Sequence, residues 1–155
     1  MQFFAIKSGT GQTSICSLDF RLLPIEAAGF MRQCLPPAEI AGKIPNPGYT
    51  FGRGGGPNYT MGDDPIAPET VLEIALKQRE TLGCTQLHSI RDGECLIWFL
   101  RLYLDGKWNE KHARAYSAAR ALMSTQHGWD KNLGEYVGWT TWEELQAETE
   151  RLLAL

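Results

Sequence analysis

Short runs of aromatic and branched residues open this chain, and helical periodicity follows in its second half. Residues 2–7 are mostly apolar and predict a strand. Residues 13–20 alternate imperfectly between apolar and polar side chains and predict a second strand. The Gly-containing turn at residues 8–11 between the two runs predicts a β-hairpin.

A short helix over residues 24–35 is expected next, with Pro24 in its first turn and Pro36-Pro37 ending it. Turn-forming residues then dominate residues 44–65. A loop of this length inside a compact domain is uncommon and is usually functional or mobile.

Helical patterns return at residues 68–82, where glutamates occupy the first turn and Gly83 suits the C-cap. One apolar stripe of this helix comprises Val71, Leu72, Ala75 and Leu76. A second helix is expected from a cap at Asn109 to about residue 125, with one face formed by Ala113, Tyr116, Ala119 and Met123. The pair Thr141 and Glu144 predicts a capping box for a final helix, with Trp142, Leu145, Leu152 and Leu153 facing inward.

Residues 86–104 fit two structures. Ser89 and Asp92 have capping-box spacing, which predicts a helix to Leu104. The Asp92-Gly93 pair is also a hairpin signal. Leucines recurring at every fourth position, Leu96, Leu100 and Leu104, favour the helix.

Residues 128–138 predict an irregular connection. Together these patterns predict a single α+β domain over residues 1–155: a small N-terminal antiparallel sheet with one short helix, a long Gly/Pro-rich loop at 44–65, and a mainly helical C-terminal half. Its 155 residues allow a sizeable core without a metal or a disulfide.

The net charge of −3 lies in the last eighteen residues. Residues 1–67 and 68–137 are each balanced, whereas residues 138–155 hold four glutamates and one arginine. A protein that binds nucleic acid through phosphates needs a basic surplus. Lys107, Lys111 and Arg114, at the start of one helix, are the best candidates for such contacts, and direct nucleic-acid binding is the least favoured function.

Four widely spaced cysteines are unlike the dense spacing of small secreted scaffolds. The first residues lack the features of a signal peptide, and no apolar stretch is long enough to span a bilayer. We therefore expect a cytoplasmic protein with reduced thiols and no membrane association.

Arg53, Gly54, Gly55 and Gly56 form the centre of the Gly-rich loop. Consecutive backbone N–H groups can bind an anion, and an arginine can add a bidentate contact to phosphate or carboxylate. The P-loop and dinucleotide-binding patterns are absent. A mobile loop that orders on a partner is the favoured interpretation.

Metal and nucleophile patterns are incomplete. Cys84, His88 and Cys95 are three zinc-ligand types without a second close pair, and we interpret both cysteines as core residues. Asp63-Asp64 with Asn58 has oxygens for a hard cation, although a solvated turn is the commoner meaning. Many Cys–His pairings are conceivable and none is specific. We expect no metal, no cofactor and no catalytic residue.

Aromatic residues concentrate in the C-terminal third. Most of the tryptophans should fill the core. Trp129 and Tyr136 lie in a polar segment and are candidates for binding a partner, as are Arg53 and Tyr59 in the long loop.

Three functions follow. The leading one is a non-enzymatic binding protein that regulates or inhibits a larger macromolecular assembly, such as an inhibitor encoded by a mobile element, with a protein or nucleoprotein partner. The alternatives are a small enzyme or nucleotide- and anion-binding protein that uses Arg53 and the glycines, and a nucleic-acid-binding protein. Neither the partner nor the oligomeric state follows from the sequence.

Overall fold

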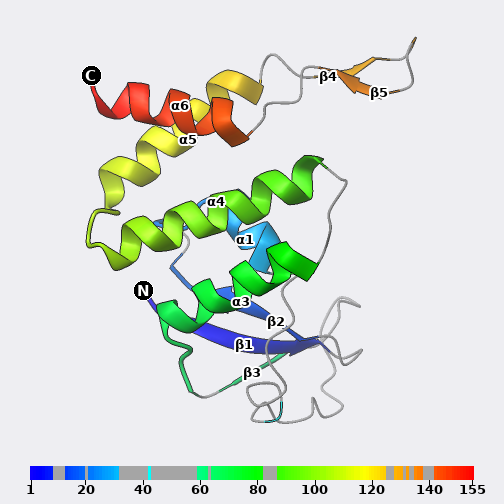
Figure 1. Ribbon diagram of the computed structural model, residues 1–155, viewed down its shortest axis with the longest axis vertical. Helices are drawn as coiled ribbons and strands as arrows, with labels where there is room; N and C mark the ends of the chain where they lie inside the picture. Colours follow the sequence, from blue (N-terminus) through cyan, green and yellow to red (C-terminus); the bar gives the residue numbers. More distant parts are fainter. Residues whose placement is uncertain are drawn as a thin grey trace.

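A computed structural model describes residues 1–8, 13–19, 21–31, 42, 59–62, 64–81, 87–124, 128–130, 132, 135–137 and 142–155. Side chains are described for these residues apart from 8, 59, 81, 87–91, 123, 124, 128–130 and 135–137. Figure 1 shows three layers: a β-sheet, a first group of helices over one of its faces, and a second group of helices beyond them.

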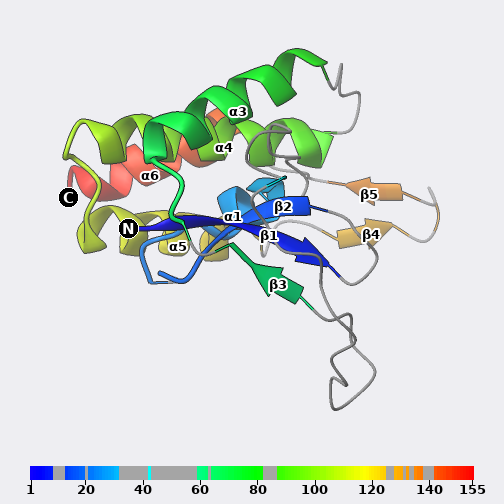
Figure 2. The same ribbon diagram turned by 90° about the horizontal axis from the view of Figure 1, so that it is seen from below.

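The sheet has β1 (Phe3–Ser8) at its centre, paired antiparallel with β2 (Thr13–Ser17) and with β3 (Tyr59–Met61). Figure 2 shows these strands side by side. Ala5 is opposite Ile15, and both are buried. Burial on alternate residues is expected of a strand with one covered face. The hairpin predicted for the first two runs is confirmed.

Part of the expected 44–65 loop is a strand, because β3 lies within it. The Gly62 N–H donates to the Ala5 carbonyl at 2.9 Å, so the pairing with β1 continues past β3. Three residues are too few to show an alternating pattern, and the long-range pairing with β1 determines this strand. Residues 44–58 and 63 lie outside the described part of the chain.

Three helices form the first helical layer. Both α1 (Ile25–Met31) and α3 (Pro68–Thr81) pack against α4 (Leu87–Leu104). The helix predicted at residues 68–82 is confirmed, and α1 lies within the range expected for the first helix, of which residues 32–35 are not described.

Residues 87–104 are one continuous helix that passes through Asp92-Gly93, so the favoured helix is confirmed and the hairpin is wrong. A Cβ atom at Gly93 would lie 3.1 Å from the Phe30 ring of α1. The glycine therefore allows α1 to approach α4 closely instead of forming a turn. Leu96 and Leu100 are fully buried, and Leu104 is partly exposed at the helix end.

Two helices that pack on each other, α5 (Glu110–Ser124) and α6 (Trp142–Leu153), form the second helical layer. The Asn109 side chain accepts hydrogen bonds from the backbone N–H groups of Lys111 and His112, at 2.9 and 3.2 Å. The predicted cap is confirmed. Thr141, the expected cap of α6, lies outside the described residues.

The segment expected to be an irregular connection contains two strands. β4 (Gly128–Asp130) pairs antiparallel with β5 (Glu135–Val137). The interpretation of residues 128–138 was wrong because strands of three residues are too short for a periodicity signal. Asn132 and Gly134, between the strands, are residues that favour turns.

The hydrophobic core contains side chains from the sheet and from both helical layers. Its fully buried large side chains include Phe3 and Ile15 of the sheet, Met31 of α1, Phe99 of α4 and Tyr116 of α5. No helix in the described part of the chain is both long enough and apolar enough to cross a membrane.

Candidate interaction surfaces

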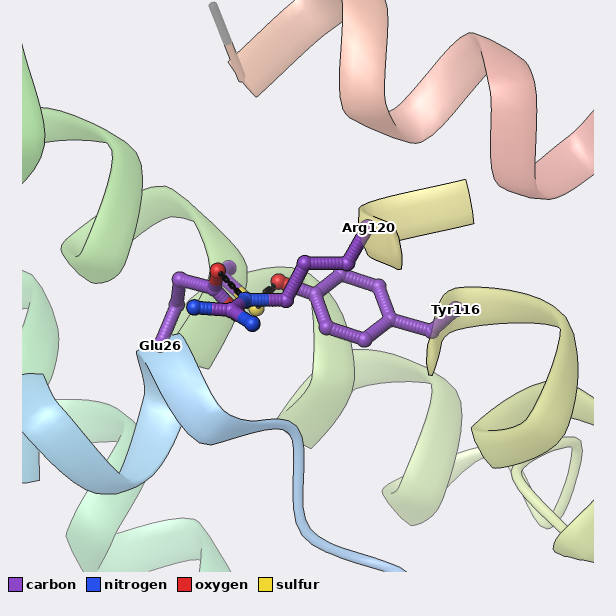
Figure 3. A network of polar contacts seen from close by, with 4 residues as sticks. Glu26, Tyr116 and Arg120 are labelled. Atoms are coloured by element: carbon purple, nitrogen blue, oxygen red, sulfur yellow. Dashed lines mark hydrogen bonds and ion pairs between the residues drawn. The ribbon is translucent and has the colours of Figure 1, made fainter. Parts of the chain in front are cut away.

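A buried carboxylate, Glu26, joins the two helical layers (Figure 3). Its Oε2 accepts a hydrogen bond from the Tyr116 hydroxyl, and its Oε1 accepts one from Arg120 Nε at 2.5 Å. Tyr116 and Arg120 are one turn apart on α5, so both reach the same acid on α1. The arrangement satisfies both carboxylate oxygens, as a buried charge requires.

The neighbouring thiol is inert. The Cys95 Sγ donates to the Tyr116 hydroxyl oxygen at 3.5 Å, and Cys95 is fully buried. Burial strongly raises the pKa of Cys95 and also that of Tyr116. Both groups stay protonated at neutral pH, so this cluster holds neither a thiolate nor a phenolate nucleophile. The interpretation of Cys95 as a core residue is confirmed.

An aromatic cluster lies between α4, α5 and α6. The Trp98 ring makes edge-to-face contacts with Trp108 and Trp142, with both centroid distances at 5.3 Å. Trp108 also donates its indole N–H to the Leu22 carbonyl at 2.7 Å. Trp108 and Trp142 are buried, which confirms for them the expected core role, and Trp98 is partly exposed.

Next to this cluster, a groove of about 220 Å³ runs between α4 and α6. Its lining residues are Glu94, Ile97, Trp98, Arg101 and Leu102 of α4 and Asp105 just after it, with Trp142 and Gln146 of α6. The α4 residues recur three and four positions apart, so they form one stripe along that helix. The sequence pattern did not indicate this groove, because its second wall comes from a helix about forty residues further along the chain.

Charged groups lie along the groove. Glu94 forms an ion pair with Arg79 of α3 at 3.1 Å. Within the described part of the chain, neither the Arg101 guanidinium nor the Asp105 carboxylate has an ion pair or a side-chain hydrogen bond. Both are exposed. Exposed charges of this kind are available to a partner.

Two of the residues selected from the sequence come together in the β4–β5 hairpin. The register places Trp129 directly opposite Tyr136. Figure 1 shows the hairpin set apart from the three-stranded sheet and from the helices. The sequence indicated the two residues, whereas their pairing follows from the fold.

Of the other predicted site residues, the structure describes only Tyr59, which is not brought to this hairpin. Tyr59 begins β3, with Ser8 as its cross-strand partner, in the other sheet. Arg53 and Gly54–Gly56 lie outside the described residues, so the anion-binding loop stays a prediction.

Metal binding also stays untested for most of the candidate ligands. Cys84, Asn58, Asp63 and the His88 side chain lie outside the described part of the chain. Among the residues whose side chains are described, no three His, Cys, Asp or Glu residues are grouped as metal ligands.

The basic residues Lys107, Lys111 and Arg114 are all exposed near the start of α5. His112 lies among them, with its ring 5.7 Å from that of Trp108. Burial and the neighbouring Lys111 charge lower the pKa of His112, which favours its neutral form. Contact with nucleic acid stays a prediction for this group.

Comparisons of the chain with protein-family models, with curated proteins and with solved structures found no match.

Proposed function

We propose that this chain is a non-enzymatic binding protein that regulates or inhibits a larger macromolecular assembly. The observation that carries the proposal is the β4–β5 hairpin, which places Trp129 opposite Tyr136 away from the main sheet. Tryptophan and tyrosine are enriched among the residues that dominate binding energy at protein interfaces. A pair of them on one small element is typical of a contact site.

The size of the hairpin supports the same proposal. Two strands of three residues each have little stability of their own in water. Docking on a partner would give such a hairpin the additional packing that it lacks. The buried polar groups Glu26, Tyr116 and Cys95, in contrast, are engaged with one another inside the protein.

The test is purification of the tagged full chain from its native host, with mass spectrometry of retained proteins and small molecules. The variant is Trp129→Ala combined with Tyr136→Ala. Leu122→Ala is a matched control, because Leu122 is an exposed apolar residue on α5. Circular dichroism checks that all three proteins are folded.

We expect a stoichiometric protein complex with the wild type and with the Leu122 control, and at least about a tenfold loss of it with the double variant. Equal recovery with the double variant would refute the role of the hairpin. Retention of a nucleotide or other anion without any protein would instead favour the alternative in which Arg53 and the glycines bind a ligand.

A further inference from the structure

We infer that the α4–α6 groove binds a basic side chain, an arginine or a lysine, from an extended segment of the protein partner. This inference rests on the proposed function, because it names the chemistry of that partner. The groove itself offers two independent features, an aromatic wall and an excess of carboxylates.

The aromatic wall is held in place on several sides. Trp98 contacts Trp108 and Trp142 edge to face and lies 6.2 Å from the Tyr116 ring. The ring therefore has little freedom, although part of it faces the groove. A guanidinium or ammonium group near an indole ring is attracted by its π electrons. Ile97 and Leu102 line the same groove and suit the aliphatic stem of such a side chain.

Carboxylates surround this wall. Glu94 of α4 and Asp105, just after this helix, line the groove. On α6, Gln146 lines the groove and donates to the Glu150 carboxylate at 3.3 Å. The described residues thus place three carboxylates in or beside the groove, those of Glu94, Asp105 and Glu150.

Among the side chains that the structure describes, two guanidinium groups oppose these three acids. Arg101 lines the groove, and Arg79 forms the ion pair with Glu94. The described acids are therefore in excess by one. The second wall belongs to α6, the helix within the segment that carries the net charge of the protein. Charge complementarity consequently favours a cationic occupant and disfavours the phosphates of a nucleic acid.

The length of the groove suits an extended segment. Glu94 of α4 and Asp105, just after the end of α4, are eleven residues apart, which corresponds to about 16 Å at the rise of an α-helix. An extended peptide covers this length with about five residues. One or two basic side chains of such a segment can reach Trp98 and the carboxylates.

A titration of the full chain tests the inference. The probe is the peptide acetyl-Gly-Arg-Gly-Arg-Gly-amide, followed through the indole N–H signals in nitrogen-15 NMR spectra. The signals are assigned with single Trp→Phe variants. We expect saturable shifts of the Trp98 and Trp142 signals and none for Trp108, whose N–H is bonded to Leu22. The affinity should fall as salt is added.

Asp105→Asn and Glu150→Gln should each weaken binding by about two- to fivefold, because each removes one charge beside the groove. Both residues are exposed, so both variants should fold. Glu73→Gln is the matched control, an exposed acid on α3 that does not line the groove. It should leave the affinity unchanged.

The inference is overturned if the same peptide with citrulline in place of arginine binds equally well, or if no saturable shift of Trp98 appears at millimolar peptide. Equal weakening by the Glu73 control would also overturn it, since the effect would then be one of net charge. Self-association abolished by Asp105→Asn would replace the proposed occupant with a second copy of the chain.

The purification experiment separates this inference from the proposed function. If Asp105→Asn with Glu150→Gln retains the partner while the Trp129 and Tyr136 variant loses it, the groove inference fails and the proposed function stands. If the wild type retains no protein, the proposed function fails.

Discussion

Arg120 Nε lies 2.5 Å from Oε1 of Glu26, and this ion pair joins two helices across 94 positions of the chain. The Glu26 side chain is only 4% exposed, whereas that of Arg120 is 45% exposed. The acid is therefore removed from water, and its stability depends on its partners. It also couples α1, which lies next to the sheet, to α5 in the outer layer.

Tyr116→Phe should lower the free energy of unfolding by about 1–3 kcal/mol, because it removes one donor from a buried carboxylate. Denaturant unfolding followed by circular dichroism measures the change. Combined in a double-mutant cycle with Glu26→Met, which removes both acceptor oxygens, the coupling energy should be about 0.5–3 kcal/mol. Purely additive effects would show that the Tyr116–Glu26 hydrogen bond contributes nothing.

Two glycines should respond in opposite ways to alanine. Gly29→Ala should raise the free energy of unfolding by up to about 1 kcal/mol, because among the described residues its new Cβ meets only the Asp92 carboxylate, at 3.5 Å. Gly93→Ala should lower it by about 1–3 kcal/mol, because its Cβ would press on the buried Phe30 ring. Thermal unfolding distinguishes the two. Equal gains at both positions would contradict the close approach of α1 to α4.

Asn109→Ala should cost about 0.5–2 kcal/mol of stability, since two N–H groups at the start of α5 lose their acceptor. Asn109→Asp retains the acceptor oxygen and serves as the control, with a stability close to that of the wild type. Chemical denaturation gives both values. If Asn109→Ala left the stability unchanged, water would replace the Asn109 side chain as the acceptor at no cost in free energy.

His112 should make the protein less stable in mild acid. Its pKa in the folded protein is below the ordinary value of 6.5 because of burial and the Lys111 charge. As pH falls below the ordinary value, His112 takes up a proton in the unfolded chain before it does so in the folded protein. The contribution of His112 to the stability of the protein is thus complete above the ordinary pKa, and it is lost as pH falls through the pKa that His112 has in the folded protein.

Proton NMR titration of the His112 ring measures this pKa directly. Lys111→Gln should raise it toward the ordinary value, because one of the two causes is removed. His112→Gln should reduce the loss of stability between about pH 7.5 and pH 5.5. A His112 pKa above the ordinary value would contradict the burial of the ring beside Trp108.

Cys95 should react with iodoacetamide only when the protein unfolds, because the thiol is buried and its pKa is strongly raised. Cys16 is partly buried, and burial also raises its pKa. It should react in the native state, more slowly than in the unfolded chain. Peptide mapping after timed labelling compares the two. Rapid labelling of native Cys95 would contradict its burial and would make Cys95 a candidate nucleophile.

The long helices could be predicted because their signals are local. The stripe that includes Val71 and Ala75 and the cap at Asn109 each act within one or two turns of chain, and the corresponding helices are present. The pair Asp92-Gly93 was ambiguous because a glycine serves a turn and a close helix contact equally well. Only the position of Phe30 shows which applies.

Short strands and long-range contacts could not be predicted in the same way. β3, β4 and β5 have three residues each, which is too few for periodicity. Glu26 and Tyr116 are 90 positions apart, and nothing near either residue indicates the other. The groove between α4 and α6 has the same origin, since its walls come from separate helices.

The sequence by itself determined the α+β class, the order of the main helices and the concentration of negative charge at the C-terminal end. These depend on backbone preferences and side-chain periods that act between near neighbours. The tertiary structure alone decided which polar groups meet in the interior, that Trp129 and Tyr136 are paired across two strands, and which surface the acidic helix helps to form. Those relationships arise from packing between distant segments, and the burial of apolar surface that drives such packing is non-directional and carries no local mark.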